Sequence, residues 1–82
     1  MDELTYIAAR FIKLTRYYDL ILTRDLFGWV VVKAYGRRGT QLGRMNTLPF
    51  DSKALAEVYF DKECARRLKR GYVRVHDGSG NQ

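Results

Sequence analysis

Four consecutive residues near the middle of the chain are of types that suit contact with a polyanion: Tyr35, Gly36, Arg37 and Arg38. An aromatic ring can stack on a base, and a guanidinium group forms paired hydrogen bonds with phosphate. A glycine lets the backbone approach a ligand closely. The surrounding stretch 29–50 predicts a strand, a glycine-rich basic turn and a second strand. We therefore expect this turn to project from a small sheet.

The positive charge of the chain is concentrated at this turn and beyond it. The net charge is +6, yet residues 1–32 carry four basic and four acidic residues and contribute nothing to it. Residues 33–76 carry eleven basic residues against four acidic ones. Such an excess is either a solubilising surface or a site for an acidic partner, of which nucleic acid is the first to consider.

Length and composition indicate a single folded domain. The chain has 82 residues, and an apolar share of 46% argues against disorder. We expect residues 1–76 to form one domain and residues 77–82 to form a disordered tail. No run approaches the roughly 20 apolar residues of a membrane span. The acidic start, Asp2 and Glu3, is unlike a signal peptide, so the expected compartment is the cytoplasm.

The few residues that could support metal or redox chemistry do not form a site in the sequence. Cys64 is the single cysteine and His76 the single histidine, too few for a structural zinc site. Cys64 cannot form a disulfide within the chain and is expected to be a small buried hydrophobe. The sequence therefore predicts no cofactor and no metal.

Hydrophobic alternation predicts five strands, over about 7–13, 17–23, 29–35, 42–47 and 72–76. Residues 4–14 also fit a helical spacing, and the strand is preferred because the next segment can pair with it. Asp51 or Ser52 can cap a helix that runs to about Arg70 and stops at Gly71. The fold class is α+β: an antiparallel sheet of four to five strands in the order β-β-β-β-α-β, with one helix packed on it.

The same patterns predict which residues face the helix. In the third strand, Val30, Val32 and Ala34 are expected to form the core, with Trp29, Val31, Lys33 and Tyr35 on the opposite face. The helix is expected to bury Ala56, Phe60, Cys64 and Leu68. In the last strand, Val73 and Val75 are expected inside and Arg74 outside. The basic residues at the helix end, Arg66, Arg67, Lys69 and Arg70, are expected to serve solvation and the helix dipole, with a specific ligand role as the alternative.

The run FGWVVVKAYGRRGTQLGRMNTLPFDS, together with the later RRLKRGYV, resembles the WGR domain family, which is named for a Trp-Gly-Arg motif. The resemblance covers about residues 11–75 and includes stand-alone bacterial members. Its matching positions are Gly36-Arg37, Gly39, Gly43, Pro49-Phe50 and Gly71-Tyr72. The chain departs from the family at the motif tryptophan, where it has Tyr35. The resemblance implies an antiparallel sheet with one helix alongside.

In DNA-dependent poly(ADP-ribose) polymerases, the family's domain helps to bind DNA ends. By position, the resemblance implies that Tyr35 stacks on a nucleotide, that Gly36 allows close approach and that Arg37 contacts phosphate. We add three residues to the expected nucleic-acid site because of their positive charge and their positions in the alternating strand pattern: Lys33, Arg38 and Arg44.

The sequence therefore predicts a nucleic-acid-binding module, with DNA, as duplex or ends, as the partner and with little sequence specificity. The alternative is a protein–protein adaptor that docks on a separately encoded enzyme or self-associates. An enzyme is disfavoured, because Asp61 and Glu63 face different sides of the helix and no serine has a credible histidine partner. No small-molecule substrate and no membrane partner is indicated.

Overall fold

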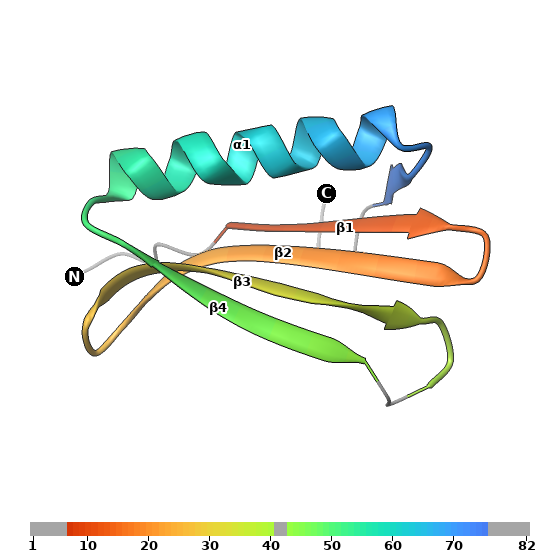
Figure 1. Cartoon of the computed structure of the whole chain (residues 1–82), viewed down its shortest axis with the longest axis horizontal. Coiled ribbons are helices and arrows are strands. Elements are labelled where there is room, and N and C mark those ends of the chain that lie inside the picture. Colours follow the sequence, from red (N-terminus) through yellow and green to blue (C-terminus); the bar gives the residue numbers. More distant parts are fainter. Residues whose placement is uncertain (1–6, 41–42, 76–82) are drawn as a thin grey trace.

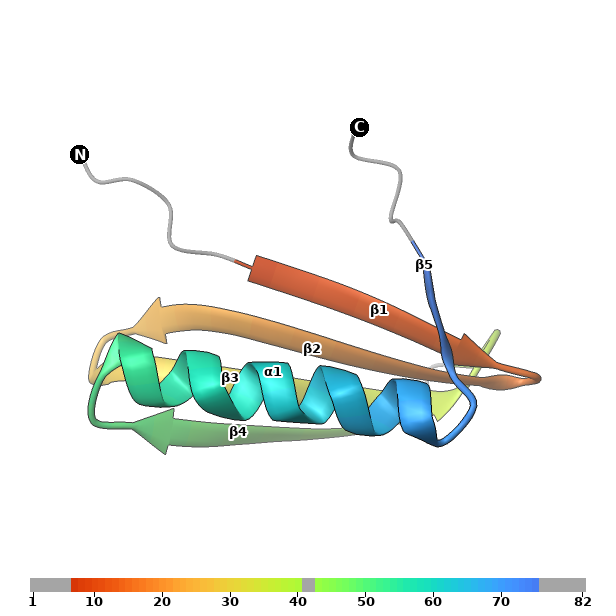
Figure 2. The same ribbon diagram turned by 90° about the horizontal axis from the view of Figure 1, so that it is seen from above.

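The computed structural model describes residues 7–40 and 43–75, and it shows one sheet with one helix on a single face (Figure 1). The helix α1 spans Lys53–Lys69 and runs along the strands, as the view from above shows (Figure 2). The five strands are β1 Ile7–Lys13, β2 Arg16–Asp25, β3 Gly28–Arg37, β4 Arg44–Phe50 and β5 Val73–Val75. The predicted α+β class and the element order are confirmed.

The sheet has the order β4-β3-β2-β1-β5, and every neighbouring pair is antiparallel. Short turns join the first four strands, and β5 returns after the helix to pair with the outer edge of β1. The turn between β1 and β2 consists of Leu14 and Thr15, because Lys13 pairs with Arg16. Leu14 adopts the left-handed φ of 54° that the turn requires.

Local side-chain and backbone contacts set both ends of α1. The Ser52 hydroxyl accepts a hydrogen bond from the Leu55 N–H at 3.2 Å, which caps the first turn. Gly71 has a φ of 94°, and the N–H groups of Gly71 and Tyr72 donate to the carbonyls of Leu68 and Arg67. This Schellman arrangement satisfies carbonyls that the helix leaves free. The expected cap and stop residues are thus confirmed.

The core lies between α1 and the sheet, and its position corrects the predicted face of β3. Val31 is fully buried, and Trp29 and Tyr35 pack against the core from the same face. Val32 and Ala34 lie on the face that α1 does not cover. Val30 is buried as predicted, but it shares the uncovered face with Val32 and Ala34, so the predicted helix-facing side was wrong. Both faces of β3 are apolar, and alternation therefore does not identify the inner one. Pairing decides it: Val31 lies opposite Leu22 of β2, which is buried.

The buried stripe of α1 also differs from the predicted one. Ala56 and Phe60 are buried as expected, but the stripe continues through Glu63 and Arg67, and Leu68 is 54% exposed. Each step of four residues turns a helix by roughly 400°. A series spaced by four therefore drifts about 40° per step away from the core, which carries Leu68 out to solvent.

The faces of β5 are the reverse of those predicted. Arg74 lies opposite the buried Phe11 of β1 and so lies on the helix side, whereas Val73 is 63% exposed. The register with β1 sets this arrangement, and a three-residue strand has too little pattern to reveal it. The predicted strand start at Leu42, His76 and the tail 77–82 lie outside the described residues.

Substitutions of two adjacent valines test which face of β3 is the core. Val31→Ala removes two methyl groups from a fully buried site and should lower the free energy of unfolding by about 2 kcal/mol. Val32→Ala acts on the uncovered face and should cost less than half as much. Urea unfolding of both variants measures the difference. Equal costs, or a larger cost at Val32, would contradict the assigned faces.

Candidate nucleic-acid interface

Tyr35, the residue at the motif position, lies near the end of β3 and faces the helix side of the sheet. It is half-buried and lies directly opposite Tyr18 of β2. The two rings are stacked, with centroids 5.3 Å apart and planes 11° from parallel. Tyr18 itself is buried. Tyr35 is therefore held by the core on one side and is partly open to solvent on the other.

Arg37 and Arg44 extend this face of the sheet. Arg37 lies opposite Arg16 of β2, and Arg44 of β4 lies opposite Tyr35. Both Arg37 and Arg44 are exposed. The alternation of side chains places Arg37 on the same face as Tyr35. An aromatic ring and two arginines thus gather at this end of the sheet.

Lys33 shares the face but is engaged with the helix. Its ammonium group donates a hydrogen bond to the Tyr59 hydroxyl at 2.9 Å and lies 5.6 Å from the centroid of that ring. The hydrogen bond raises the pKa of Lys33, although partial burial opposes the change. Lys33 therefore carries its charge into the helix–sheet boundary, and its side chain is less available to a ligand than those of the exposed arginines.

Gly36 has a packing role beside the face. A Cβ atom on Gly36 would lie 3.0 Å from the Gly43 Cα and 3.3 Å from the Tyr17 hydroxyl oxygen. Gly43 leaves even less room, because a Cβ there would lie 2.8 Å from the Tyr35 carbonyl oxygen and closer still to the Tyr17 hydroxyl oxygen. The two glycines let β3 approach the start of β4 closely.

Arg38 turns away from the other expected site residues. Its backbone N–H donates to the Thr15 carbonyl at 2.6 Å. Its side chain lines a second hollow, of about 620 Å³, on the face of the sheet that α1 does not cover. That hollow also contains Asp19, whose carboxylate oxygen lies 3.3 Å from Arg10 Nε without forming a well-directed hydrogen bond. A carboxylate in the wall makes this hollow the poorer site for an anion.

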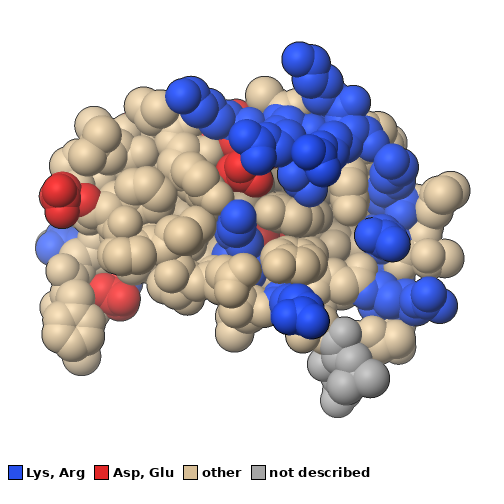
Figure 3. Space-filling view, viewed as in Figure 1, with Lys and Arg blue, Asp and Glu red and all other residues tan. Residues whose placement is uncertain are grey.

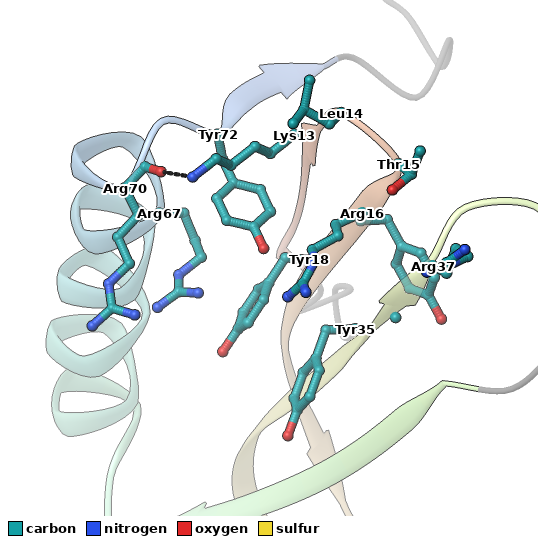
Figure 4. Close-up of a pocket in the computed structure, with 12 residues that line it drawn as sticks. Lys13, Leu14, Thr15, Arg16, Tyr18, Tyr35, Arg37, Arg67, Arg70 and Tyr72 are labelled. Carbon is teal, nitrogen blue, oxygen red and sulfur yellow. Dashed lines mark hydrogen bonds between the residues drawn. The ribbon is translucent and has the colours of Figure 1, made fainter.

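A cleft opens where the end of α1, the β1–β2 turn and the end of β3 meet (Figure 4). Its cavity volume is about 590 Å³. Tyr35, Gly36 and Arg37 lie in its wall, together with Tyr18 and Tyr72. Five cationic side chains line it: Lys13, Arg16, Arg37, Arg67 and Arg70. Among the described residues, no aspartate or glutamate does, so the cleft is suited to a negatively charged ligand.

Arg67 is buried in the wall of the cleft and is not solvated, contrary to the preferred interpretation of the helix end from sequence. Its guanidinium carbon lies 4.2 Å from the centroid of Tyr18 and 5.7 Å from that of Tyr72. In Figure 4, Arg67 and Tyr35 lie on either side of Tyr18. Helical phase could have located Arg67, because it lies seven residues after the buried Phe60 and therefore on the same stripe.

The hydroxyl group of Tyr18 stays neutral within this cationic stack. Burial raises the pKa of Tyr18, while the charges of Lys33 and Arg67 act in the opposite direction. The hydroxyl donates a long hydrogen bond of 3.5 Å to the buried Glu63 carboxylate. Glu63 in turn lies 3.5 Å from Arg66, and neither of these two residues is in the cleft lining.

A hydrogen bond in the wall of the cleft links the end of β1 to the end of α1. The Lys13 ammonium group, at the end of β1, donates to the Arg70 carbonyl oxygen at 2.6 Å. It also lies 5.9 Å from the centroid of Tyr72. Because Arg70 follows α1 directly, this bond holds the helix end against the β1–β2 turn, which sequence reasoning could not foresee from residues 57 positions apart.

Positive charge gathers over the same end of the molecule. Figure 3 shows Lys and Arg side chains over the C-terminal half of α1 and the adjoining end of the sheet, with few at the opposite end.

The described residues contain no group of three or more His, Cys, Asp or Glu side chains that could hold a metal ion. Cys64 is half-buried, and burial raises the pKa of its thiol. No described helix is long and apolar enough to cross a membrane.

Together, these features define a small α+β domain with a cationic cleft lined by tyrosines. A family model described as WGR domain matches residues 4–79, nearly the whole chain. The chain therefore belongs to the WGR domain family, as its resemblance suggested. Neither the comparison with curated proteins nor that with solved structures found a match.

The stacking of Tyr35 on Tyr18 makes Tyr35 a structural residue as well as a candidate ligand contact. Tyr35→Ala removes a half-buried ring from a stack and should lower the free energy of unfolding by about 1–3 kcal/mol. Tyr35→Phe keeps the ring and should change stability by less than about 0.5 kcal/mol. Thermal unfolding followed by circular dichroism measures both. An unchanged melting temperature in Tyr35→Ala would show that the stack contributes no stability.

Proposed function

We propose that this chain is a nucleic-acid-binding module that binds DNA, as duplex or ends, with little sequence specificity. The observation that carries the proposal is the cleft, in which Tyr35 and Arg37 of the family motif lie together with four more cationic side chains. Membership of the WGR family supports the same reading. A site of this composition matches the alternating negative charge and aromatic bases of a nucleic-acid strand.

The composition of the cleft also supports weak sequence preference. Guanidinium and ammonium groups bind phosphate oxygens, which are the same in every sequence. Tyrosine rings stack on any base, because every base has a π-face. The described lining contains no Asp, Glu, Asn or Gln side chain to read base edges.

A binding role fits the cleft better than a catalytic one. The hydroxyl groups in its described lining belong to Thr15 and to tyrosines, and no histidine or carboxylate stands beside them as a general base. We therefore propose a module that holds its ligand without transforming it.

Arginine substitutions at the two ends of the sheet test the proposal. Arg37→Ala should weaken binding to a labelled DNA duplex by about 3–10-fold and reduce the slope of log K against log salt by about 1, since one phosphate contact is lost. Arg24→Ala removes the same charge at the far end of β2, where Arg24 lies over Trp29. It should leave affinity within about twofold of the wild type. Fluorescence anisotropy at several salt concentrations measures both variants.

Two outcomes would count against this function. If the wild type does not bind DNA even at low salt, the domain is not a DNA-binding module. If the two variants weaken binding equally, the interaction depends on net charge alone and not on the cleft.

One observation favours a second candidate, the protein–protein adaptor. The turn between β2 and β3 presents Leu26 and Phe27 to solvent, 94% and 95% exposed. The Asp25 carboxylate accepts hydrogen bonds from the N–H groups of Phe27 and Gly28 at 2.8 and 3.0 Å, which holds the turn in shape. Two large apolar side chains on an ordered tip are suited to insertion into an apolar pocket of another protein. The tip lies at the end of the sheet opposite the cleft (Figure 1).

Site-specific photo-crosslinking tests this second candidate. A photoreactive phenylalanine analogue at position 27 should give one discrete protein adduct in cells, because an anchor side chain is buried in its partner. The same analogue at the exposed Lys62 of α1 is the control and should give none. Adding Leu26→Ser should abolish the adduct at position 27. Identical patterns at positions 27 and 62 would contradict a docking role for the turn.

A further inference from the structure

Arg67 places a positive charge in the wall of the cleft, and it forms no ion pair with any acidic residue in the part of the chain that the structure describes. The residue is only 9% exposed, and its Nε atom is buried and has no hydrogen-bond partner. Its guanidinium group lies against the faces of Tyr18 and Tyr72, which are neutral. The buried carboxylate of Glu63, four residues earlier on α1, accepts a hydrogen bond from the Tyr18 hydroxyl and is outside the cleft lining. A desolvated guanidinium group of this kind is stabilised when an anion enters the adjoining cavity.

The aromatic surface that remains free in the cleft comes from two tyrosines. Tyr18 is covered, since Arg67 lies over its ring and Tyr35 is stacked on it. Tyr35 and Tyr72 are only half-buried and both line the cavity. The cavity therefore offers a cationic wall and, beside it, the surface of aromatic rings. This pairing matches a phosphate group joined to a planar base.

The size of the cavity limits the form of nucleic acid that can enter. Its volume of about 590 Å³ falls within the roughly 300–1,000 Å³ of sites that take small molecules. A nucleotide fits such a space, whereas a base held in a duplex is covered by its stacked neighbours and its pairing partner. An exposed cation such as Arg37 can contact a duplex from outside, but Arg67 can contact only a group that enters the cleft.

We propose that the cleft binds one unpaired nucleotide of a nucleic-acid strand, with its phosphate against Arg67 and its base against Tyr35 or Tyr72. The domain then prefers single strands and duplexes with single-stranded extensions over blunt duplexes. This inference rests on the proposed function and specifies the part of the nucleic acid that enters the cleft. Arg16 and Arg37 hold the neighbouring phosphates from the rim.

Three labelled DNA ligands test the preference: a blunt duplex, the same duplex with a four-nucleotide extension, and the isolated strand. At equal salt, the extension should raise affinity by about tenfold, which is within the effect of one stacked base. Arg67→Met should reduce this ratio to about one. Arg66→Met is the matched control, because it removes the same charge one position away, from a side chain outside the cleft lining. It should lower affinity for all three ligands alike and keep the ratio.

Because Arg67 is packed against two rings, the wild-type protein provides a second measurement that needs no variant. A ¹⁵N–¹H spectrum of arginine Nε–H groups, recorded during titration with a thymidine dinucleotide, should show the Arg67 resonance shifting, with that of Arg24 unchanged. Arg67→Lys keeps the charge but loses the planar group. It should fold, by circular dichroism, and should still lose most of the preference for the extension.

The outcomes separate this inference from the proposed function. If the wild type binds the blunt duplex as tightly as the extended one while Arg37→Ala still weakens both, the module binds DNA but the unpaired-nucleotide site is refuted. An unshifted Arg67 resonance at saturation refutes it as well. If none of the three ligands binds at low salt, both proposals fail together.

Discussion

The cleft of this domain depends on one stack of side chains, Arg67 over Tyr18 and Tyr18 against Tyr35. The stack crosses from α1 to β2 and then to β3, so it fixes the distance between the helix end and the sheet. It also brings a guanidinium group to the boundary of the core, where water is scarce. The tyrosine faces stabilise that charge by cation–π attraction. They do not neutralise it, and the wall of the cleft stays positive.

Several cationic groups can crowd around this stack because other parts of the chain offset their repulsion. The negative end of the α1 dipole lies at the cleft, and Lys13 donates to the Arg70 carbonyl there. Arg16 and Arg37 are exposed, so that solvent screens them. The helix carbonyls and solvent thus offset part of the repulsion. No carboxylate of the described residues lines the cleft itself, so its positive potential remains available to a ligand.

The two ends of the sheet have different surfaces. The cationic cleft lies at the end where β3 finishes, and the turn with Leu26 and Phe27 lies at the end where β3 begins. Strands of ten residues, such as β2 and β3, separate them. A ligand in the cleft therefore leaves the apolar turn uncovered. This arrangement is compatible with a domain that contacts nucleic acid and a protein at the same time.

Local sequence determined the features that depend on neighbouring residues. The order of strands and helix, the cap at Ser52 and the stop at Gly71 follow from alternation and capping, which act within a few residues. Because side chains alternate between the two faces of a strand, the sequence also places Tyr35 and Arg37 on one face of β3. Only the tertiary structure decided which face of β3 packs against α1, because the strand is apolar on both sides and the choice depends on its pairing with β2. It also decided that Arg67 lines a cleft and that Lys33 bonds to Tyr59, since both depend on where α1 crosses the sheet.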